Sequence, residues 1–332
     1  MKTVIFLGSH KDFAGLRLGA ALGTFLTTKG EEVLLAGAKK DLPAYLELPT
    51  WPLSAAASTK TMAAALKKAG AQKVISLTHL PSCEAAAALH IPFVYIEPEN
   101  FKEAKPVKNK KALLAKAAQV LVIGTGDKPL DKKRYGTNAV RVANPAIWVE
   151  HYNYNKPACF KKENNIVAAG NFTKNGGLDV LLATWARLAP AHKTWHLTLV
   201  GEGTQKAALK KFITKHHLEP STELVPADTD LYSLLRNADI YVHAARAAEG
   251  LNELLDAMAS KLPVVATDVP GVAELVANGI SGLVVNPGEE EPLTIALDEL
   301  MVNWGKRVGM AIEASKHKER FSFEQFAKLV TK

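Results

Sequence analysis

The sequence predicts an α/β fold of two doubly wound domains, each built on a parallel sheet. The chain has 332 residues, well above the roughly 150 residues of a typical domain, so two separate cores are expected. Short apolar runs alternate with longer segments of helical period, which is the pattern of a parallel sheet covered by helices. Hydrophobic residues make up 48% and charged residues 22% of the chain, a balance that excludes a disordered chain or a collagen.

In the first half, apolar runs short enough to be strands are separated by segments of helical period. The expected strands are Thr3–Leu7, Glu32–Ala36, Lys73–Leu77, Pro92–Ile96, Val120–Ile123 and Ala139–Ala143. The expected helices between them include Leu16–Lys29, Thr59–Ala69 and Asn109–Ala118. Since helices separate successive strands, these strands are expected to run parallel.

A second series of the same kind begins after residue 164. Its expected strands are Ile166–Ala169, His196–Val200, Thr222–Val225, Ile240–His243, Val264–Thr267 and Gly282–Val285. Its expected helices are Leu178–Leu188, Gln205–His217, Asp230–Asn237, Glu253–Ser260, Gly271–Ala277 and Glu291–Trp304. The repeated alternation indicates a second doubly wound domain.

The boundary is expected within residues 151–164, which contain Pro157 and show neither periodicity. We therefore place an N-terminal domain at 1–155 and a C-terminal domain at 156–320. A last helix in 321–332 is a candidate for packing back on the N-terminal domain. Ligands of open α/β sheets bind at the carboxyl ends of strands, so a site is expected on the strand-to-helix loops, in the cleft between two facing domains.

The two cysteines, Cys83 and Cys159, lie far apart and have no neighbouring metal ligands, which favours a reduced, cytoplasmic setting. Residues 1–8 lack the apolar core and the small-residue cleavage site of a signal peptide. No stretch approaches the roughly 20 uninterrupted apolar residues that a membrane span requires. A cytoplasmic protein without a membrane span is expected.

Positive charge is concentrated in the first half, where residues 1–150 carry a net +9, against −1 for residues 151–332. Such a surface suits an anionic membrane or a phosphorylated substrate, or it is an ordinary solvated surface. Nucleic acid is not expected as a partner, because the lysines are not interleaved with aromatic or glycine-rich platforms. The lysines concerned are Lys39, Lys40, Lys60, Lys67, Lys68, Lys102, Lys105, Lys108, Lys110, Lys111 and Lys116.

The most informative segment is 238–267. A buried strand ending at His243 runs into a small-residue loop with Glu249-Gly250, a helix follows with Asp256-Ala-Met-Ala259, and Leu262-Pro-Val-Val-Ala-Thr267 forms the next strand. This segment closely resembles the retaining nucleotide-sugar glycosyltransferases of family 4, the glycosyl transferases group 1, which have the GT-B fold of two Rossmann-like domains facing a central cleft. The resemblance covers roughly residues 165–330, and the first half is matched only by its architecture. It continues through Gly170–Gly176, Leu197–Gly203 and Gly271–Val285.

The resemblance implies that Glu249 accepts hydrogen bonds from the donor sugar and that Asp256 accepts them from the ribose. A helix N-terminus offers unpaired N–H groups and about half a positive charge to a leaving diphosphate, a task that suits the Ala245–Gly250 loop. Glu249 and Asp256 are seven residues apart, so on a continuous helix both lie on one face; otherwise they are solvated carboxylates at a helix start. The remaining donor contacts are expected from Gly15, Asn171, Lys174, Arg246, Gly250, Leu251 and Asn252.

The sequence departs from the family at several of these positions. Six residues separate Glu249 from Asp256, one fewer than between the two glutamates of the family. Where the family has Gly-Arg and later Lys-Gly to hold the diphosphate, this chain reads Gly170-Asn171 and Asn175-Gly176. Lys174 and Arg246 are the candidate replacements for the two cations.

A third departure is the stretch 92–100, which lacks the histidine that many family members carry after the fourth strand. Glu97 or Glu99 is a candidate for a polar role toward the acceptor, and His79 follows another strand. A histidine at such a position is also commonly structural. The candidate catalytic residues are therefore Glu249, Lys174, Glu97 and His79.

We expect a hexosyltransferase that moves a sugar from a nucleotide-sugar donor to a hydroxyl acceptor with retention, without a metal or cofactor. The acceptor would be a glycan, a glycolipid or a small molecule. The basic first domain favours lipopolysaccharide or polysaccharide assembly as a peripheral protein on the inner face of the membrane. The departures motivate an alternative, a noncatalytic GT-B-like binding or scaffold protein that has lost donor affinity. Cations turned to solvent and carboxylates that do not converge would favour that alternative.

Two further motifs have simpler interpretations. Asp228-Thr-Asp230 resembles a metal-binding pair of aspartates, but it precedes a helix, so a helix N-cap is expected instead. Gly201-Glu-Gly203 lacks the third glycine and the downstream acidic residue of a dinucleotide site. A nicotinamide enzyme is therefore not expected.

Overall fold

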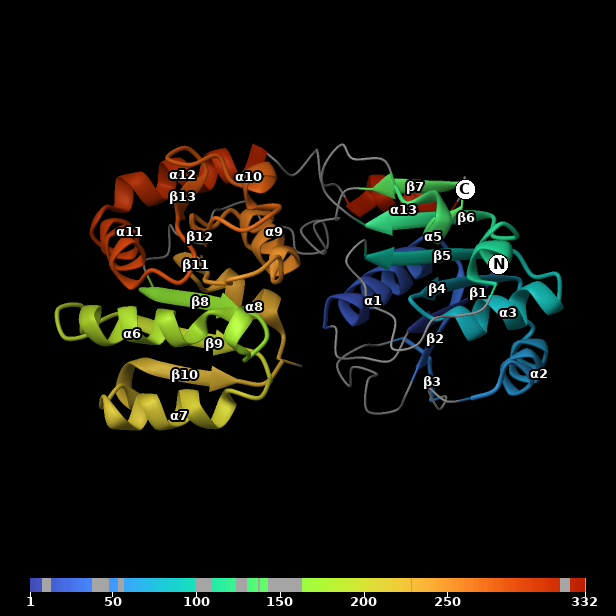
Figure 1. Ribbon diagram of the computed structural model, residues 1–332, viewed down its shortest axis with the longest axis horizontal. Helices are drawn as coiled ribbons and strands as arrows, with labels where there is room; N and C mark the ends of the chain where they lie inside the picture. The colour runs from blue at the N-terminus through green and yellow to red at the C-terminus, as the bar shows by residue number, and fades with distance from the viewer. Residues whose placement is uncertain are drawn as a thin grey trace. The chain divides into compact units, whose positions relative to one another are not determined.

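The structure is a computed structural model that divides into two compact units, Met1–Ile147 with Phe323–Lys332, and Trp148–Ser322 (Figure 1). It describes residues 1–7, 13–37, 48–52, 57–98, 109–123, 130–136, 138–142, 163–227, 229–316 and 323–331. Each unit is a parallel sheet with helices packed on it. The prediction of two parallel-sheet α/β domains is confirmed, while the expected boundary at 155/156 lies outside the described residues.

The first unit holds a seven-stranded parallel sheet in the order β3-β2-β1-β4-β5-β6-β7. Strand order reverses between β1 and β4, where Val4 lies opposite Val74. The short edge strand β3 was not expected, because three partly exposed residues carry no apolar pattern. The strands are β1 (Lys2–Leu7), β2 (Glu32–Gly37), β3 (Thr50–Pro52), β4 (Lys73–Leu77), β5 (Phe93–Pro98), β6 (Gln119–Ile123) and β7 (Ala139–Val142).

The helices of the first unit have clear local start and stop signals. Ser58 accepts a hydrogen bond from the Thr61 N–H and begins α2, which ends at Gly70 with φ +65°. His79 begins α3 in the same way, by accepting from the Ser82 N–H. These helices are α1 (Phe13–Thr28), α2 (Thr59–Ala69), α3 (Leu80–Ala88), α4 (Lys110–Leu114), α5 (Lys132–Tyr135) and α13 (Phe323–Thr331).

The second unit holds a six-stranded parallel sheet in the order β10-β9-β8-β11-β12-β13. Strand order reverses between β8 and β11. Every strand expected from the sequence is present with bounds that agree to within one residue, because buried parallel strands are continuous apolar runs. They are β8 (Asn165–Ala169), β9 (His196–Val200), β10 (Thr222–Val225), β11 (Ile240–His243), β12 (Val264–Thr267) and β13 (Gly282–Val285).

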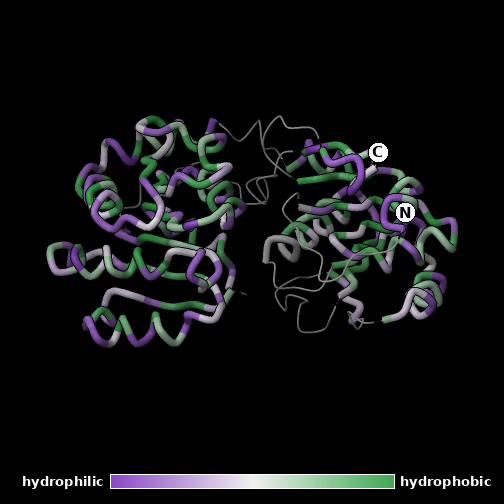
Figure 2. The backbone as a smooth tube through the Cα atoms, in the orientation of Figure 1, coloured by the Kyte–Doolittle hydropathy of each residue, from purple (hydrophilic) through white to green (hydrophobic). Residues whose placement is uncertain are grey.

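The helices of the second unit follow its strands in turn, and Figure 2 shows hydrophilic residues recurring along their length. The expected helix at 291–304 ends at Val302, and a further helix begins at Trp304. The elements are η3 (Lys174–Gly176), α6 (Leu178–Leu188), α7 (Lys206–Lys215), η4 (Glu219–Ser221), α8 (Leu231–Arg236), α9 (Leu251–Ala259), α10 (Val272–Leu275), α11 (Glu290–Val302) and α12 (Trp304–Lys316).

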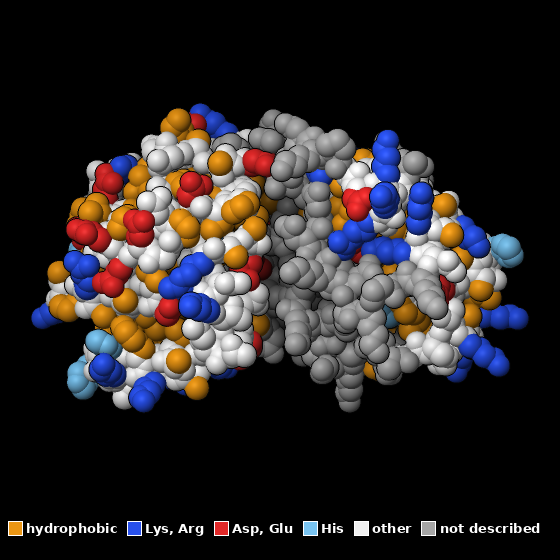
Figure 3. All heavy atoms as spheres, viewed as in Figure 1, with side chains coloured by type: hydrophobic (Ala, Val, Ile, Leu, Met, Phe, Trp, Pro, Cys, Tyr) orange, Lys and Arg blue, Asp and Glu red, His pale blue; other side chains and the backbone are white. Residues whose placement is uncertain are grey.

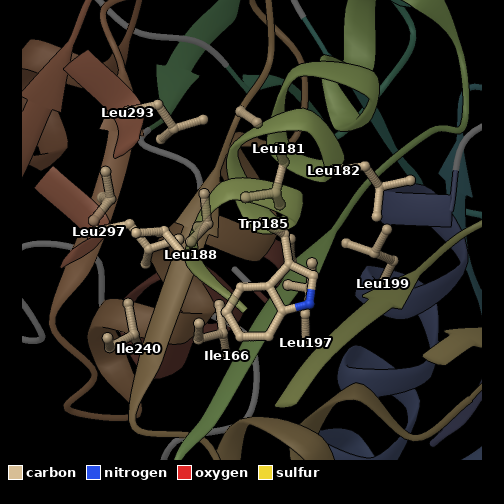
Figure 4. Packing of buried hydrophobic residues seen from close by; sticks show 14 of the residues in the cluster. Ile166, Leu181, Leu182, Trp185, Leu188, Leu197, Leu199, Ile240, Leu293 and Leu297 are labelled. Carbon is tan, nitrogen blue, oxygen red and sulfur yellow. The ribbon is translucent and has the colours of Figure 1, made fainter. Parts of the chain in front are cut away.

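Trp185 is central to the core of the second unit, where α6 packs on the sheet (Figure 4). Its side chain is fully buried with Leu197 and Ile240 in one cluster, and its indole N–H donates to Ser221 Oγ at 3.2 Å. A buried aromatic side chain of this size dominates local packing. This core fixes α6, and therefore the position of the loop that precedes it.

The last helix, α13, belongs to the first unit although it follows the second in the chain. The buried Lys73 Nζ at the start of β4 donates to Val330 O at 2.8 Å, and Phe323 packs edge-on against Phe25 of α1. A cation at the carboxyl end of a helix is favoured by the helix dipole. In the described part of the chain, none of the helices combines the length and the apolar character needed to cross a membrane.

Candidate functional site

Two loops of the second unit lie at the carboxyl ends of β8 and β11, the neighbouring strands between which strand order reverses. The first loop comprises residues 170–177 and the second residues 244–250. In an open parallel sheet, the crevice at such a reversal is the usual ligand site. Of the residues expected to bind the donor, five lie on these loops: Asn171, Lys174, Arg246, Glu249 and Gly250.

The two loops are in close contact through their backbones. A Cβ at Gly177 would lie 1.8 Å from Ala244 O, and its φ of +70° is itself unfavourable for other residues. The Arg246 N–H donates to Asn175 O at 2.6 Å. Glycine is therefore required at position 177, where Ala244 of the second loop comes closest to the first.

Arg246 forms an ion pair with Asp179 in the first turn of α6. Its Nη1 and Nη2 donate to Asp179 Oδ1 and Oδ2 at 2.6 and 3.0 Å, and Nη1 also donates to Lys174 O at 2.7 Å. Burial opposes ionisation of Asp179, but the hydrogen bonds and charge of Arg246 outweigh it and lower the pKa of Asp179. In the unliganded protein the Arg246 guanidinium is thus paired with a carboxylate, and its expected role as a diphosphate cation stays a prediction.

Glu249 is the half-buried carboxylate of the site. Its Oε1 is buried and has no hydrogen-bond partner among the residues that the structure describes. Burial raises the pKa of Glu249, while the nearby polar side chains of Asn171 and Thr173 act in the opposite direction. An acceptor atom in this state suits a ligand that brings hydroxyl groups.

Glu249 and Asp256 do not share a helix face. Helix α9 begins at Leu251 after Gly250, whose φ is +72°, so Glu249 precedes the helix. Asp256 is 0% exposed, and its Oδ2 accepts from Tyr232 Oη at 3.2 Å. The expectation of one shared helix face is therefore corrected, and the Asp256 carboxylate packs inside the unit; its expected ribose contact stays a prediction.

His243, the last residue of β11, is a site residue that the sequence reasoning missed. It is 2% exposed, and its Nε2 lies 2.8 Å from Glu249 O. A carbonyl only accepts, so Nε2 carries the hydrogen and donates it. Burial lowers the pKa of His243, which favours the neutral ring. A histidine closing an otherwise apolar strand was the signal available in the sequence.

The remaining donor candidates lie around these groups. Asn171 and Lys174 are exposed, and Gly250, Leu251 and Asn252 are half-buried at the start of α9. The nine residues of α9 present the unpaired N–H groups of its first turn next to Glu249. A cation, a helix N-terminus and a carboxylate oxygen with no partner among the described residues thus occur at one edge of the sheet.

The first-unit candidates have structural partners. Glu97 is 0% exposed, and its carboxylate pairs with Lys110 Nζ at 2.7 Å and with Arg134 Nη2 at 2.6 Å; Tyr95 Oη also donates to it. Both oxygens are thus bonded inside the unit, and its expected role toward an acceptor stays a prediction. His79 Nδ1 accepts from the Ser82 N–H at 3.3 Å and is thereby used as a helix cap.

Gly15 lies within the first turn of α1 rather than in an open loop, and Glu99 lies outside the described residues. Asp228 is also outside them, while Asp230 caps α8 by accepting from the Tyr232 and Ser233 N–H groups, as predicted. Over the described ranges, no three His, Cys, Asp or Glu side chains gather as a metal site.

Basic side chains are prominent on the described surface of the first unit. On the face shown in Figure 3, Lys and Arg side chains outnumber Asp and Glu on the first unit, whereas basic and acidic side chains are mixed on the second unit. Of the lysines expected on this surface, Lys39, Lys40, Lys102, Lys105 and Lys108 lie outside the described residues, and Lys110 is buried. The exposed ones include Lys60, Lys67, Lys68, Lys111, Lys116, Lys132 and Lys133.

The region that contains the two loops matches a known family and known proteins. Residues 163–303 match the family model of the glycosyl transferases group 1. An uncharacterized glycosyltransferase of Haemophilus influenzae is 30% identical over 189 residues, 56% of this chain and 52% of that protein. The amylovoran biosynthesis glycosyltransferase AmsD of Erwinia amylovora is 32% identical over 146 residues, 43% of this chain and 40% of that protein. The chain spans about half or less of the length of these curated relatives.

Similarity to solved structures extends over the whole chain. The crystal structure of Anabaena HepE in complex with UDP and glucose covers 100% of this chain and 98% of that chain, with a TM-score of 0.71 and 17% identity. At this identity the likeness concerns the fold. The match to the glycosyl transferases group 1 model thus covers residues 163–303, while the fold shared along the chain is the GT-B fold.

Proposed function

We propose that the protein is a glycosyltransferase that transfers a sugar from a nucleotide-sugar donor to a hydroxyl acceptor with retention of configuration. The observation that carries this proposal is the buried Oε1 of Glu249, which has no hydrogen-bond partner in the described part of the chain, at the β8–β11 reversal. It lies inside the region that matches the glycosyl transferases group 1 model. The UDP and glucose bound to HepE support a nucleoside diphosphate sugar as the donor.

On the donor side, the N–H groups at the start of α9 and the exposed Lys174 would offset the charge of the diphosphate. Glu249 Oε1 would accept a hydrogen bond from a sugar hydroxyl, and Asn171 lies beside it. In this assignment the protein positions the donor and stabilises the leaving diphosphate. The leaving group itself would assist the incoming hydroxyl on the same face of the sugar, without a metal ion.

On the acceptor side, the basic surface of the first unit supports an acceptor that carries phosphate or lies on an anionic membrane face. Amylovoran biosynthesis by AmsD supports a role in polysaccharide or other envelope glycan assembly. The protein would then act as a peripheral protein on the cytoplasmic side.

A second candidate function is a noncatalytic binding or scaffold protein with the same fold. Two observations favour it. Arg246 is paired with Asp179, and Asp256 is buried within α9, whereas Glu249 lies before that helix. Both reduce the number of groups available to hold a diphosphate and a ribose.

Thermal unfolding with a panel of nucleoside diphosphates and nucleotide sugars separates the two candidates. A ligand present at a hundred times its dissociation constant stabilises the folded protein by about 2.7 kcal/mol. The transferase predicts stabilisation by one nucleotide and its sugar, which is weakened in Lys174→Ala and Glu249→Ala. No shift with any nucleotide at millimolar concentration would establish the noncatalytic candidate instead.

A further inference from the structure

Arg246 joins the two loops of the candidate site, and we propose that its ion pair with Asp179 is a clamp that positions Glu249 for the donor sugar. In this assignment Arg246 and Asp179 are positioning residues that do not touch the donor. The inference rests on the proposed function for the identity of the ligand. The clamp itself is a property of the unliganded protein.

Arg246 contacts three residues: Lys174 and Asn175 of the first loop, and Asp179 in the helix that follows it. Its side chain donates to both oxygens of Asp179 and to Lys174 O, and its own N–H donates to Asn175 O at 2.6 Å. The guanidinium is a rigid planar fork that matches a carboxylate with two parallel hydrogen bonds, which a lysine ammonium cannot reproduce. One residue of the second loop is thus fixed to the first loop through both its backbone and its side chain.

Glu249 lies three residues further along the second loop. Its carboxyl is set against the first loop, beside Asn171 and Thr173, and a Cβ at Gly176 would lie 3.6 Å from its Oε1. Its carbonyl is held from the other side by the buried His243. The segment from Arg246 to Glu249 is therefore fastened at both ends. Loss of the Arg246 side-chain bonds would leave only backbone-level contacts near that end, from the Arg246 N–H to Asn175 O and from Thr267 to Ala245 O, and would let the carboxylate move more.

A different interpretation would treat Asp179 as a competitor that occupies Arg246 until a donor diphosphate displaces it. The geometry favours the clamp, because the Arg246 guanidinium already donates to three acceptor atoms of the protein, two on Asp179 and one on Lys174. Movement of the side chain to a diphosphate would break the Lys174 contact as well as both Asp179 contacts, while the bond from the backbone N–H of Arg246 to Asn175 O does not depend on the side chain.

The first test measures backbone hydrogen exchange of the unliganded full chain, as the wild type and as Arg246→Lys, Arg246→Gln and Asp179→Asn. The clamp predicts faster exchange in peptides covering both 171–177 and 244–250 in each variant. The double variant Arg246→Gln/Asp179→Asn should add little to Arg246→Gln, since both changes break the same pair. Arg187→Gln is the matched control, because Arg187 of α6 also pairs with an acidic residue, Glu290 of α11, at 3.3 Å. Unchanged exchange in both loops would overturn the clamp.

The second test measures the affinity of the same proteins for UDP and for UDP-glucose by titration calorimetry. The clamp predicts that Arg246→Gln and Asp179→Asn lower the affinity for UDP-glucose about tenfold, as a loss of Glu249 would, with a much smaller effect on UDP. Arg246→Lys should behave like Arg246→Gln. Tighter UDP binding by Asp179→Asn would identify Asp179 as a competitor and overturn the clamp.

The two tests separate failure of the clamp from failure of the proposed function. If the wild type binds neither UDP nor UDP-glucose, the proposed donor is wrong, while hydrogen exchange still decides whether the clamp holds the loops. If the wild type binds UDP-glucose and neither Arg246→Gln nor Asp179→Asn changes that affinity, the donor assignment stands and the clamp is wrong.

Discussion

At Gly177 the backbone of one loop passes so close to Ala244 that no side chain fits between them. Gly279 has a similar positive φ of +76°, but nothing lies within 4 Å of the Cβ that it would gain. Both glycines have a left-handed backbone, but only Gly177 is crowded by a neighbour. Comparing substitutions at the two positions therefore separates the cost of the backbone conformation from the cost of crowding. The absence of a side chain at Gly177 is what lets the two site loops pack this closely.

Alanine substitutions at the two glycines should therefore differ. Gly279→Ala is expected to lower the free energy of unfolding by about 1 kcal/mol, the left-handed backbone penalty alone. Gly177→Ala should cost about 1–3 kcal/mol more, because Ala244 must move. Urea unfolding of both variants measures this, and equal losses would show that the loops separate freely.

His243 makes the stability of the second unit depend on pH. Its pKa is lowered in the folded protein by burial, so the unfolded chain binds more protons as the pH falls below about 6.5. The stabilisation is therefore present above that pH and is lost as the pH falls toward the lowered pKa of the folded state. His243→Gln keeps a side-chain N–H donor but does not titrate.

The wild type should lose more stability than His243→Gln when the pH is lowered from 7.5 to 5.5. Unfolding temperatures at the two pH values give the comparison. Identical pH dependence of the two proteins would contradict the neutral, buried state of His243.

Among the elements, the helices α4 and α5 are held to β5 by the ion pairs of Glu97 with Lys110 and Arg134. Lys110 is buried, while its neighbour Lys111 is exposed. A buried carboxylate that loses one of its cations retains the cost of desolvation without the full compensation. These ion pairs therefore stabilise the packing of α4 and α5 on β5.

Lys110→Met is expected to lower the free energy of unfolding by about 2 kcal/mol or more, since only Arg134 then offsets the charge of Glu97. Lys111→Met should change it by less than about 0.5 kcal/mol. Chemical denaturation of the two variants provides the test. A neutral effect of Lys110→Met would mean that the cluster does not hold these helices.

The elements of the second unit could be predicted closely, since each strand is a short apolar run bounded by a turn or loop. The break between α11 and α12 at Asn303 carries no glycine or proline, so it was missed. The placement of Asn171, Lys174 and Glu249 on loops after strands was expected from the family resemblance and from the carboxyl-end rule, while the strand order that makes the two loops neighbours came from the structure. The pairing of Arg246 with Asp179, which are 67 residues apart, depends on loop packing that no local pattern encodes.

On the scale of the whole molecule, the chain ends in the unit where it began. Helix α13 contributes Phe326 and Val330 as buried side chains, and Lys73 binds its last turn. Since α13 belongs to the first unit, its removal should weaken that unit selectively.

Deletion of residues 323–332 is expected to make the first unit the earlier target of limited proteolysis, with the second unit unchanged. Lys73→Met should have the same effect in weaker form, because it removes one buried hydrogen bond worth about 1–2 kcal/mol, while the exposed Lys68→Met serves as its control. Equal loss of resistance in both units would contradict the assignment of α13 to the first.

The central claim is that a nucleotide sugar binds where strand order reverses in the second unit. Hydrogen exchange of the wild-type chain with and without saturating UDP-glucose tests it most directly. We predict slower exchange in the loop 170–177 and in residues 244–253, with no change in α7 or α12 of the same unit. Protection that spares both loops, or no protection at any concentration, would contradict the account.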